Sequence, residues 1–249
     1  MIATIEGAGV ELAVHTDGRS SDRAVLLIHG IASDARAWAP LAEQLAAAGG
    51  YVISYDRRGY GASGAPQPYT ATTVLEQAQD AIAVLDGLDA ERALAVGDGF
   101  GALVALDLLR RFPERVGAVV AADPPLLELI EAGSEVLSTQ RLMLEEALRD
   151  GGPAAAVDRW LEGRVDGDDL ARARAAHEAF FADFAGLPSW PATRRELRAM
   201  DAPVTVVTGV KSAPHLREAA AALVGLLPNA SVDPSGDLLA AVAELQKQQ

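Results

Sequence analysis

The sequence predicts a doubly wound α/β fold, in which a mostly parallel β-sheet is covered by helices on both faces. Two observations support this prediction. Short, continuously apolar segments alternate with helical segments over residues 24–122, and the alternation returns over residues 202–249. Strands of a parallel sheet are buried on both faces, so they form uninterrupted apolar runs. The 249 residues are also enough for one such domain with an inserted segment.

The first half of the chain supplies most of the predicted sheet. Residues 2–6 and 10–15 flank a glycine-rich turn and are typical of a hairpin. Buried strands are then expected at 24–29, 51–56, 93–96 and 116–122. Helices are expected between them at 38–48, 73–88 and 100–111, because apolar residues recur there at helical spacing. This alternation favours right-handed βαβ units.

The alternation stops after Asp123-Pro124-Pro125. Residues 126–198 are helical and charged, and they contain no strand-like run. Strand and helix patterns return at 202–209, 214–227, 230–232 and from Leu238 onward. We therefore expect residues 1–125 and 199–249 to form an α/β core, and residues 126–198 to form a helical insertion.

The composition narrows the classes of function. With 21 basic and 35 acidic side chains, the net charge is -14, which disfavours nucleic acid and anionic membranes as partners. The chain has no cysteine, which excludes disulfides and a thiolate nucleophile, and four histidines leave few candidates for a general base. The first residues lack the features of a signal peptide, and no apolar run approaches the ~18 residues of a membrane span. We expect a cytoplasmic protein, for which a homodimer is compatible with the sequence.

Three motifs follow predicted strands. Residues 28–31 (Ile-His-Gly-Ile) end the first buried strand, and residues 56–63 (Asp-Arg-Arg-Gly-Tyr-Gly-Ala-Ser) follow the second. Residues 97–101 (Gly-Asp-Gly-Phe-Gly) join the third strand to a helix. In this order and spacing the motifs resemble those of the α/β-hydrolase superfamily. The resemblance covers the whole chain, and the insertion lies where that family carries a helical cap.

The third motif departs from the family pattern. The family's nucleophile elbow is normally G-x-S-x-G, which assigns Gly99 to the nucleophile position, where it supplies no side chain. A register with Asp98 as nucleophile is disfavoured, because Val96 and Phe100 would then fill positions that require small residues. The resemblance therefore implies a vacant nucleophile position.

The other two triad positions also differ from the family. The family base is a His after the last strand, where this chain has Asp237, for which we favour a role as the N-cap of the final helix. The family acid usually follows the strand at 202–209, but residues 209–212 include no acid. A family variant places the acid before Pro-Pro, which matches Asp123, although a turn-stabilising role is as good an explanation. A conventional acyl-enzyme mechanism is therefore not expected.

The histidines do not fill the base position. The resemblance implies that residues 30–34, which follow the first buried strand and which we call the oxyanion loop, form part of an oxyanion hole. It places His29 behind this loop, in a structural role. His15 lies in the hairpin. His177 lies in the insertion, either reaching into a cleft or, as we favour, on a helix surface. His215 begins a helix, where solvent exposure is expected.

Catalytic groups remain despite these losses. The resemblance implies that the oxyanion hole consists of the backbone amides of Ile31 and Phe100, which do not depend on a serine. Two aimed amides at a helix N-terminus favour an oxyanion or an enolate. Asp98, Asp123 and Asp237 are the candidate acids or bases, since a carboxyl in a partly apolar pocket has a raised pKa.

The sequence also suggests where a ligand would bind. The insertion holds five of the chain's eight Phe and Trp residues, which indicates a pocket for an apolar or aromatic small molecule, although the rings equally serve to join insertion and core. The candidate binding residues are His29, Gly30, Asp34, Arg36, Trp38, His177, Phe181 and Trp190.

We thus expect a non-hydrolytic enzyme without cofactor or metal, a lyase, isomerase or cyclase that acts on an apolar carbonyl compound. A catalytically silent ligand-binding or scaffolding protein is one alternative, and a residual hydrolase using water activated by Asp98 or Asp237 is another. The segment Gly97-x-Gly99-x-x-Ala102 also fits a dinucleotide fingerprint, with Asp123 as ribose acid. That interpretation is disfavoured, because the fingerprint normally opens the first βαβ unit of its domain.

Overall fold

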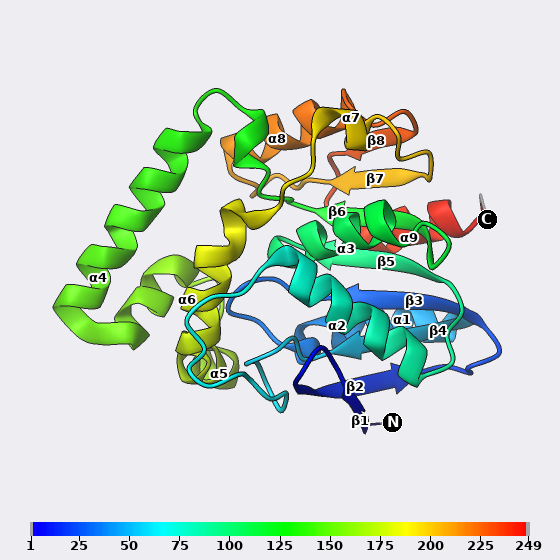
Figure 1. Cartoon of the computed structure of the whole chain (residues 1–249), viewed down its shortest axis with the longest axis horizontal. Helices are drawn as coiled ribbons and strands as arrows, with labels where there is room; N and C mark the ends of the chain where they lie inside the picture. The colour runs from blue at the N-terminus through cyan, green and yellow to red at the C-terminus, as the bar shows by residue number, and fades with distance from the viewer. Residues whose placement is uncertain (1, 248–249) are drawn as a thin grey trace.

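A computed structural model describes residues 2–247 and contains one eight-stranded sheet (Figure 1). Its strand order is β1-β2-β4-β3-β5-β6-β7-β8. The strands are β1 (Ile2–Glu6), β2 (Glu11–Asp17), β3 (Arg23–Ile28), β4 (Gly50–Tyr55), β5 (Ala93–Asp98), β6 (Val116–Ala122), β7 (Val204–Val207) and β8 (Ala230–Asp233). The β1–β2 and β2–β4 pairs are antiparallel, and the remaining pairs are parallel. The predicted fold class is therefore confirmed.

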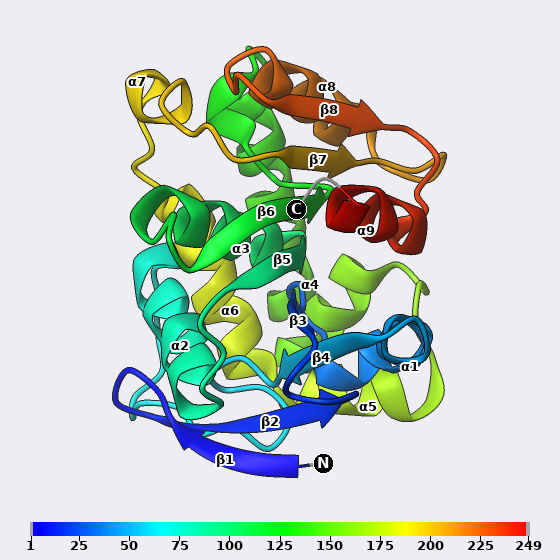
Figure 2. The same cartoon turned by 90° about the vertical axis from the view of Figure 1, so that its right-hand side faces the viewer.

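Helices cover both faces of the sheet (Figure 2). One face packs against α2 (Val74–Gly87), α3 (Phe100–Arg111) and α8 (Pro214–Val224). The other packs against α1 (Ala39–Ala47) and α9 (Leu238–Lys247). All residues of β4 and β6 are buried, which explains why these strands are continuous apolar runs in the sequence.

A group of helices lies at one edge of the sheet. These helices are α4 (Gly133–Leu161), α5 (Gly167–Ala175) and α6 (His177–Gly186), and we call them the cap helices. The parallel strands point toward them in Figure 1, so the loops that follow β3, β5, β6 and β7 lie on the cap side. Open α/β sheets bind their ligands at this edge. Residues 126–198 contain helices and no strand, as predicted.

Local chemistry moves some of the predicted boundaries. The helix expected at 38–48 is preceded by a 3-10 turn, η1 (Ala35–Trp38), because the Asp34 side chain accepts a hydrogen bond from the Arg36 amide and begins the turn earlier. Gly152 has φ 76° and kinks α4 in front of Pro153. No described helix is apolar over a length that would cross a membrane.

Candidate functional site

The turn between β5 and α3 is shaped by glycines. Gly99 forms its tip with φ 52° and ψ -114°, a conformation that L-residues rarely adopt. A Cβ on Gly97 would lie 2.2 Å from the Gly101 carbonyl oxygen, and a Cβ on Gly101 would lie 2.1 Å from the Ile28 oxygen. Both flanking positions therefore require glycine, which supports the register that places Gly99 at the tip. A Cβ on Gly99 would meet nothing within 4 Å, so the space above the tip is open.

Two backbone amides lie at this turn and at the loop beside it. Phe100 is the first residue of α3, so its amide has no acceptor within the helix and lies at the positive end of the helix dipole. Ile31 lies in the loop after β3, and the start of α3 packs on that loop, since Gly101 contacts the carbonyls that precede it. The structure thus brings both predicted oxyanion donors to the cap side of the sheet.

His29 holds the oxyanion loop in place. Its Nε2 accepts a hydrogen bond from the Arg57 amide at 2.9 Å, so its Nδ1 carries the proton and donates to the Gly30 oxygen at 2.9 Å. Burial, and then the charge of Arg57, lower the pKa of His29 well below its usual value, so the ring stays neutral. The predicted ligand contacts of His29 and Gly30 stay a prediction; in the structure the His29 ring and the Gly30 carbonyl bond to one another and to Arg57.

Asp98 is an accessible carboxylate next to the oxyanion loop. It ends β5, and its Oδ2 lies 2.8 Å from the point where a Cβ on Gly30 would be. Its side chain is exposed, yet the surrounding protein desolvates it. This desolvation, together with the negative charge of Asp123, raises the pKa of Asp98 to about 6, against the opposing charges of Arg164 and Arg57.

Asp123 lies within electrostatic reach of Asp98. It follows β6 with φ 42°, and its Oδ2 accepts a hydrogen bond from Ser212 Oγ at 2.8 Å. Its Oδ1 is buried without a hydrogen-bond partner among the described residues. Burial raises the pKa of Asp123, although Ser212, Arg217 and His215 act in the opposite direction. The structure therefore brings two of the three predicted carboxylates together.

His215 belongs to the same group, which differs from the sequence expectation. It is half-buried at the start of α8 rather than exposed. Desolvation lowers its pKa, and the charge of Asp123 partly offsets this effect. The sequence around His215 carries no signal of this neighbour, because the contact depends on the pairing of β6 with β7. Within residues 2–247, no three His, Cys, Asp or Glu side chains are arranged to hold a metal ion.

Asp237 has a different place. Its side chain is exposed, and its Oδ1 accepts a hydrogen bond from the Ala240 amide at 3.0 Å, so it caps α9. The loop that carries it does pack against the segment after β7, since a Cβ on Gly236 would lie 3.3 Å from the Gly209 Cα. The capping interpretation thus accounts for this residue without any catalytic role.

We expect Asp237→Ala to lower the free energy of unfolding by about 1 kcal/mol, because the first turn of α9 loses its side-chain acceptor. Urea denaturation measures this loss, and Asp237→Ser, which keeps a capping oxygen, is the control. Turnover of any substrate should be unchanged in both variants. A large loss of turnover in Asp237→Ala would contradict the purely structural role.

Two predicted binding residues lie in the core instead. Trp38 is buried on the face of the sheet that packs against α1 and α9. Trp190 is buried in the core on the opposite face, and its Nε1 donates to Asp107 Oδ1 at 2.9 Å. The burial of both rings gives them a place in the core, and their role in binding a ligand stays a prediction.

The other aromatic residues of the insertion mainly contact one another. Trp160 packs edge-on against Phe180 and Phe184, with ring centroids 5.9 and 5.7 Å apart. Phe181 is half-buried against Phe180, and His177 Nδ1 lies 3.1 Å from the Arg174 oxygen. The rings therefore hold the cap helices together. They also form one cluster with Ile31 and Ala32, so they join the insertion to the core, as the alternative explanation stated.

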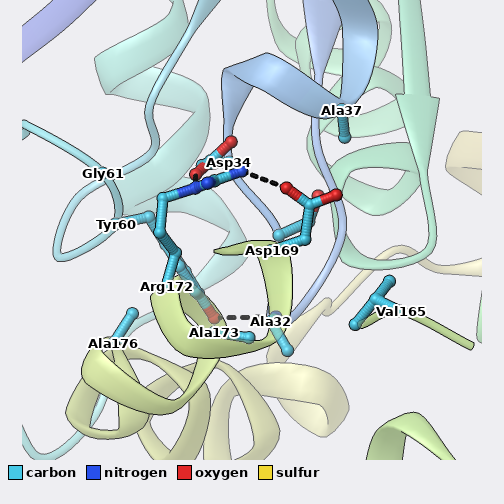
Figure 3. Close-up of a pocket in the computed structure, with 11 residues that line it drawn as sticks. Ala32, Asp34, Ala37, Tyr60, Gly61, Val165, Asp169, Arg172, Ala173 and Ala176 are labelled. Carbon is cyan, nitrogen blue, oxygen red and sulfur yellow. Dashed lines mark hydrogen bonds and ion pairs between the residues drawn. The ribbon is translucent and has the colours of Figure 1, made fainter. Parts of the chain in front are cut away.

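A small pocket separates the oxyanion loop from α5 (Figure 3). Its volume is about 60 Å³, below that of typical ligand sites. Asp34 lines it and accepts a hydrogen bond from Arg172 Nε at 2.6 Å, while Arg172 also pairs with Asp169. Asp34 thus ties α5 to the core, and Arg36 is exposed to solvent, so neither predicted binding residue points to a ligand here.

Comparisons with known proteins agree with this architecture. A family model described as alpha/beta hydrolase fold matches residues 23–220. Epoxide hydrolase A of Mycobacterium tuberculosis is 31% identical over 206 residues, which are 75% of this chain and 64% of that protein. An uncharacterized hydrolase of Bacillus subtilis is 30% identical over 161 residues, 64% of this chain and 57% of that protein. The matched parts thus span less than two thirds of either relative.

A solved structure extends the likeness to the whole fold. The crystal structure from a study of carboxylesterases of Nitrososphaera gargenis has a TM-score of 0.83 to this chain at 16% identity, and the match covers 100% of both chains. With the family match over residues 23–220, the glycine-shaped turn and the mostly parallel sheet agree on one assignment. The chain belongs to the α/β-hydrolase fold family.

Proposed function

We propose that the protein hydrolyses a small, neutral carbonyl compound, an ester or a lactone, by direct attack of water activated by Asp98. The observation that carries the proposal is the Asp98 carboxylate, whose pKa is about 6, beside the open tip of the turn at Gly99. A base is most effective when its pKa lies near the working pH. The relatives named as hydrolases support hydrolysis over a non-hydrolytic reaction.

Each step of this reaction has a group to perform it. The substrate carbonyl oxygen accepts hydrogen bonds from the Ile31 and Phe100 amides, and water occupies the space above Gly99. Asp98 takes a proton from this water while the water oxygen bonds to the carbonyl carbon. The two amides stabilise the tetrahedral oxyanion that results. The bond to the leaving oxygen then breaks, and protonated Asp98 returns its proton to that oxygen. The products are an acid and an alcohol, and no covalent enzyme intermediate forms.

A non-hydrolytic reaction is the second candidate. The observation that favours it is the absence of a side chain at Gly99, since the same base and amides would serve to remove a proton from the carbon beside a carbonyl and to stabilise the enolate. Both the hydrolytic and the non-hydrolytic reaction assume that Gly99 occupies the nucleophile position and that no side chain forms a covalent intermediate there. A protein that only binds its ligand is the third.

Oxygen isotope labelling separates these candidates. A panel of aryl esters and lactones is incubated with excess protein in H2 18O, and both product and protein are analysed by mass spectrometry. Hydrolysis by direct water attack places one 18O in the acid product and leaves the protein mass unchanged at all times. A rearranged product without 18O would favour the non-hydrolytic reaction. Unchanged input across the panel, or a covalent adduct, would contradict the proposal.

The pH dependence gives a second test. Because Asp98 must be ionised to accept a proton, kcat/KM should rise with pH around a midpoint of about 6. Asp123→Asn removes the neighbouring negative charge, so the pKa of Asp98 and the midpoint should both fall. Asp237→Asn is the control, since this exposed carboxylate serves α9 and should leave the midpoint in place. An unchanged midpoint in Asp123→Asn would argue against Asp98 as the base.

A further inference from the structure

One of the two oxyanion donors shares a peptide unit with a carbonyl that is held in place. The trans peptide between Gly30 and Ile31 carries the Gly30 oxygen and the Ile31 amide, which point in opposite directions because the unit is planar. The Gly30 oxygen accepts hydrogen bonds from Arg57 Nη2 at 3.0 Å and from His29 Nδ1 at 2.9 Å. Fixing this oxygen therefore fixes the direction of the Ile31 amide.

The residues on either side of this peptide are held by the same group of side chains. On the N-terminal side of this peptide, Arg57 Nε donates to the His29 oxygen at 2.8 Å. On its C-terminal side, the Ala32 amide donates to the Tyr60 hydroxyl at 3.4 Å. Ile31 is thus bracketed by contacts to Arg57 and Tyr60, both of which come from the loop after β4.

Asp183 in the cap helix α6 joins these two side chains. Its Oδ2 accepts hydrogen bonds from Arg57 Nη2 at 2.6 Å and from the Tyr60 hydroxyl at 2.8 Å. Its Oδ1 accepts hydrogen bonds from Arg57 Nη1 and from Gln77 Nε2, each at 3.1 Å. The side chains of Arg57 and Asp183 are both 0% exposed. A buried guanidinium without a compensating charge is strongly destabilised. Among the groups that hold Arg57, Asp183 is the one that supplies this charge, while Gln77 Oε1 accepts a further hydrogen bond from Nη1 at 3.0 Å.

We propose that Asp183 is a positioning residue that aims the Ile31 amide through Arg57, so that the oxyanion hole is complete only while α6 is docked on the core. The other donor depends less on this ion pair, because the Phe100 amide is set by the first turn of α3, a core helix, and only the Phe100 ring contacts Arg57, with Cζ 5.1 Å from the ring centroid. The hole thus combines one donor fixed within the core and one fixed by the cap. This inference rests on the proposed function for its kinetic consequence, but its structural consequence is independent of turnover.

The test compares the two donors in one variant. Asp183→Asn keeps the shape of the side chain and removes its charge, so the Ile31 amide resonance should shift in 1H–15N NMR spectra and its hydrogen exchange should become faster. The Phe100 amide should change less than the Ile31 amide, because Arg57 contacts the Phe100 ring but makes no hydrogen bond to its peptide unit. With a substrate found by isotope labelling, kcat should fall about 10- to 100-fold while KM changes less than about threefold, since losing one oxyanion donor outright costs 10²–10³. Asp183→Glu, which retains the charge, should recover part of both effects.

The control breaks a different contact between cap and core. Arg172→Gln removes the ion pair of α5 with Asp34 and should leave the Ile31 amide and kcat near the parent values. If Asp183→Asn does not fold, Tyr60→Phe removes the acceptor of the Ala32 amide and one donor to Asp183 Oδ2, but it keeps the ion pair between Arg57 and Asp183, so it should give a smaller shift at Ile31. Unchanged Ile31 signals in whichever variant folds would overturn the inference. Shifted signals in a protein that turns over no substrate would support it and count against the proposed function.

Discussion

Asp98→Asn should lower kcat by at least about 100-fold, because the amide cannot accept a proton and general-base catalysis contributes roughly 10²–10⁴ to a rate. KM should change little, since asparagine has nearly the same shape and the two amide donors are untouched. Initial rates at pH 8, where the Asp98 carboxylate of the parent protein is fully ionised, measure the loss. Asp237→Asn should keep the parent rate, because it changes an exposed carboxylate that serves only to cap α9.

The same substitution should make the protein more stable at neutral pH. The folded-state pKa of Asp98 is about 6, above the unfolded value near 3.9, so the folded state binds the proton more tightly. That stabilisation is present below about pH 4 and is lost as the pH rises through about 6, above which the charged group only destabilises the fold. Asn removes this penalty. Because the side chain is exposed, solvent screening limits the gain to about 1 kcal/mol, or roughly 2–4 °C in Tm.

Melting curves at two pH values separate the two consequences. At pH 8 the Asp98→Asn variant should melt above the parent protein, and at pH 4 the difference should disappear. An inactive variant with a higher Tm would show that the lost activity is not due to unfolding, which is typical of residues that are retained for function at a cost in stability. A lower Tm at pH 8 would contradict a carboxylate destabilised by its surroundings.

The fold was predictable because its signals are local. Strands buried on both faces, such as β4 and β6, appear as apolar runs whatever lies next to them. The glycines on either side of Gly99 were equally informative, since each is required by a close backbone contact, Gly97 within the turn and Gly101 against the end of β3. Asp98 and Asp123 were predictable for the same reason, because they end neighbouring strands, and the parallel pairing of β5 and β6 brings their ends together.

The parts of the site that could not be predicted depend on contacts between distant segments. His215 lies near Asp123 because β6 pairs with β7, and nothing in the segment around His215 reveals that neighbour. Trp38 and Trp190 are of a residue type that often contacts ligands. Only the three-dimensional structure shows that both rings are buried in the core. Asp183 lies in α6, a mostly apolar helix, and the local pattern does not show that a buried arginine is its partner. Only the burial of Arg57 beneath α6 shows that Asp183 compensates the charge of a buried arginine.

Arg57→Met should lower the free energy of unfolding by about 3–5 kcal/mol, because it leaves the buried Asp183 carboxylate without its compensating charge. The substitution also removes the donors that hold the His29 and Gly30 carbonyls. A domain with roughly 10–15 kcal/mol of stability, the upper part of the usual range, should remain folded after this loss. Denaturation in guanidinium chloride, followed by circular dichroism, measures the change. A loss below about 1 kcal/mol would show that the ion pair contributes little.

The double variant Arg57→Met with Asp183→Leu separates the stability of the cap contact from its function. Replacing a buried ion pair by apolar side chains is often neutral or stabilising, so the double variant should be more stable than either single variant, with a coupling free energy of roughly 0.5–3 kcal/mol. Its kcat should nevertheless stay low, because no guanidinium holds the Gly30 carbonyl and the Ile31 amide is no longer aimed. If Arg57 and Asp183 served only to join the cap to the core, restoring stability would restore kcat as well. A stable double variant with parent-like kcat would therefore assign the pair to folding alone, whereas a stable variant with low kcat would assign it to the geometry of the oxyanion hole.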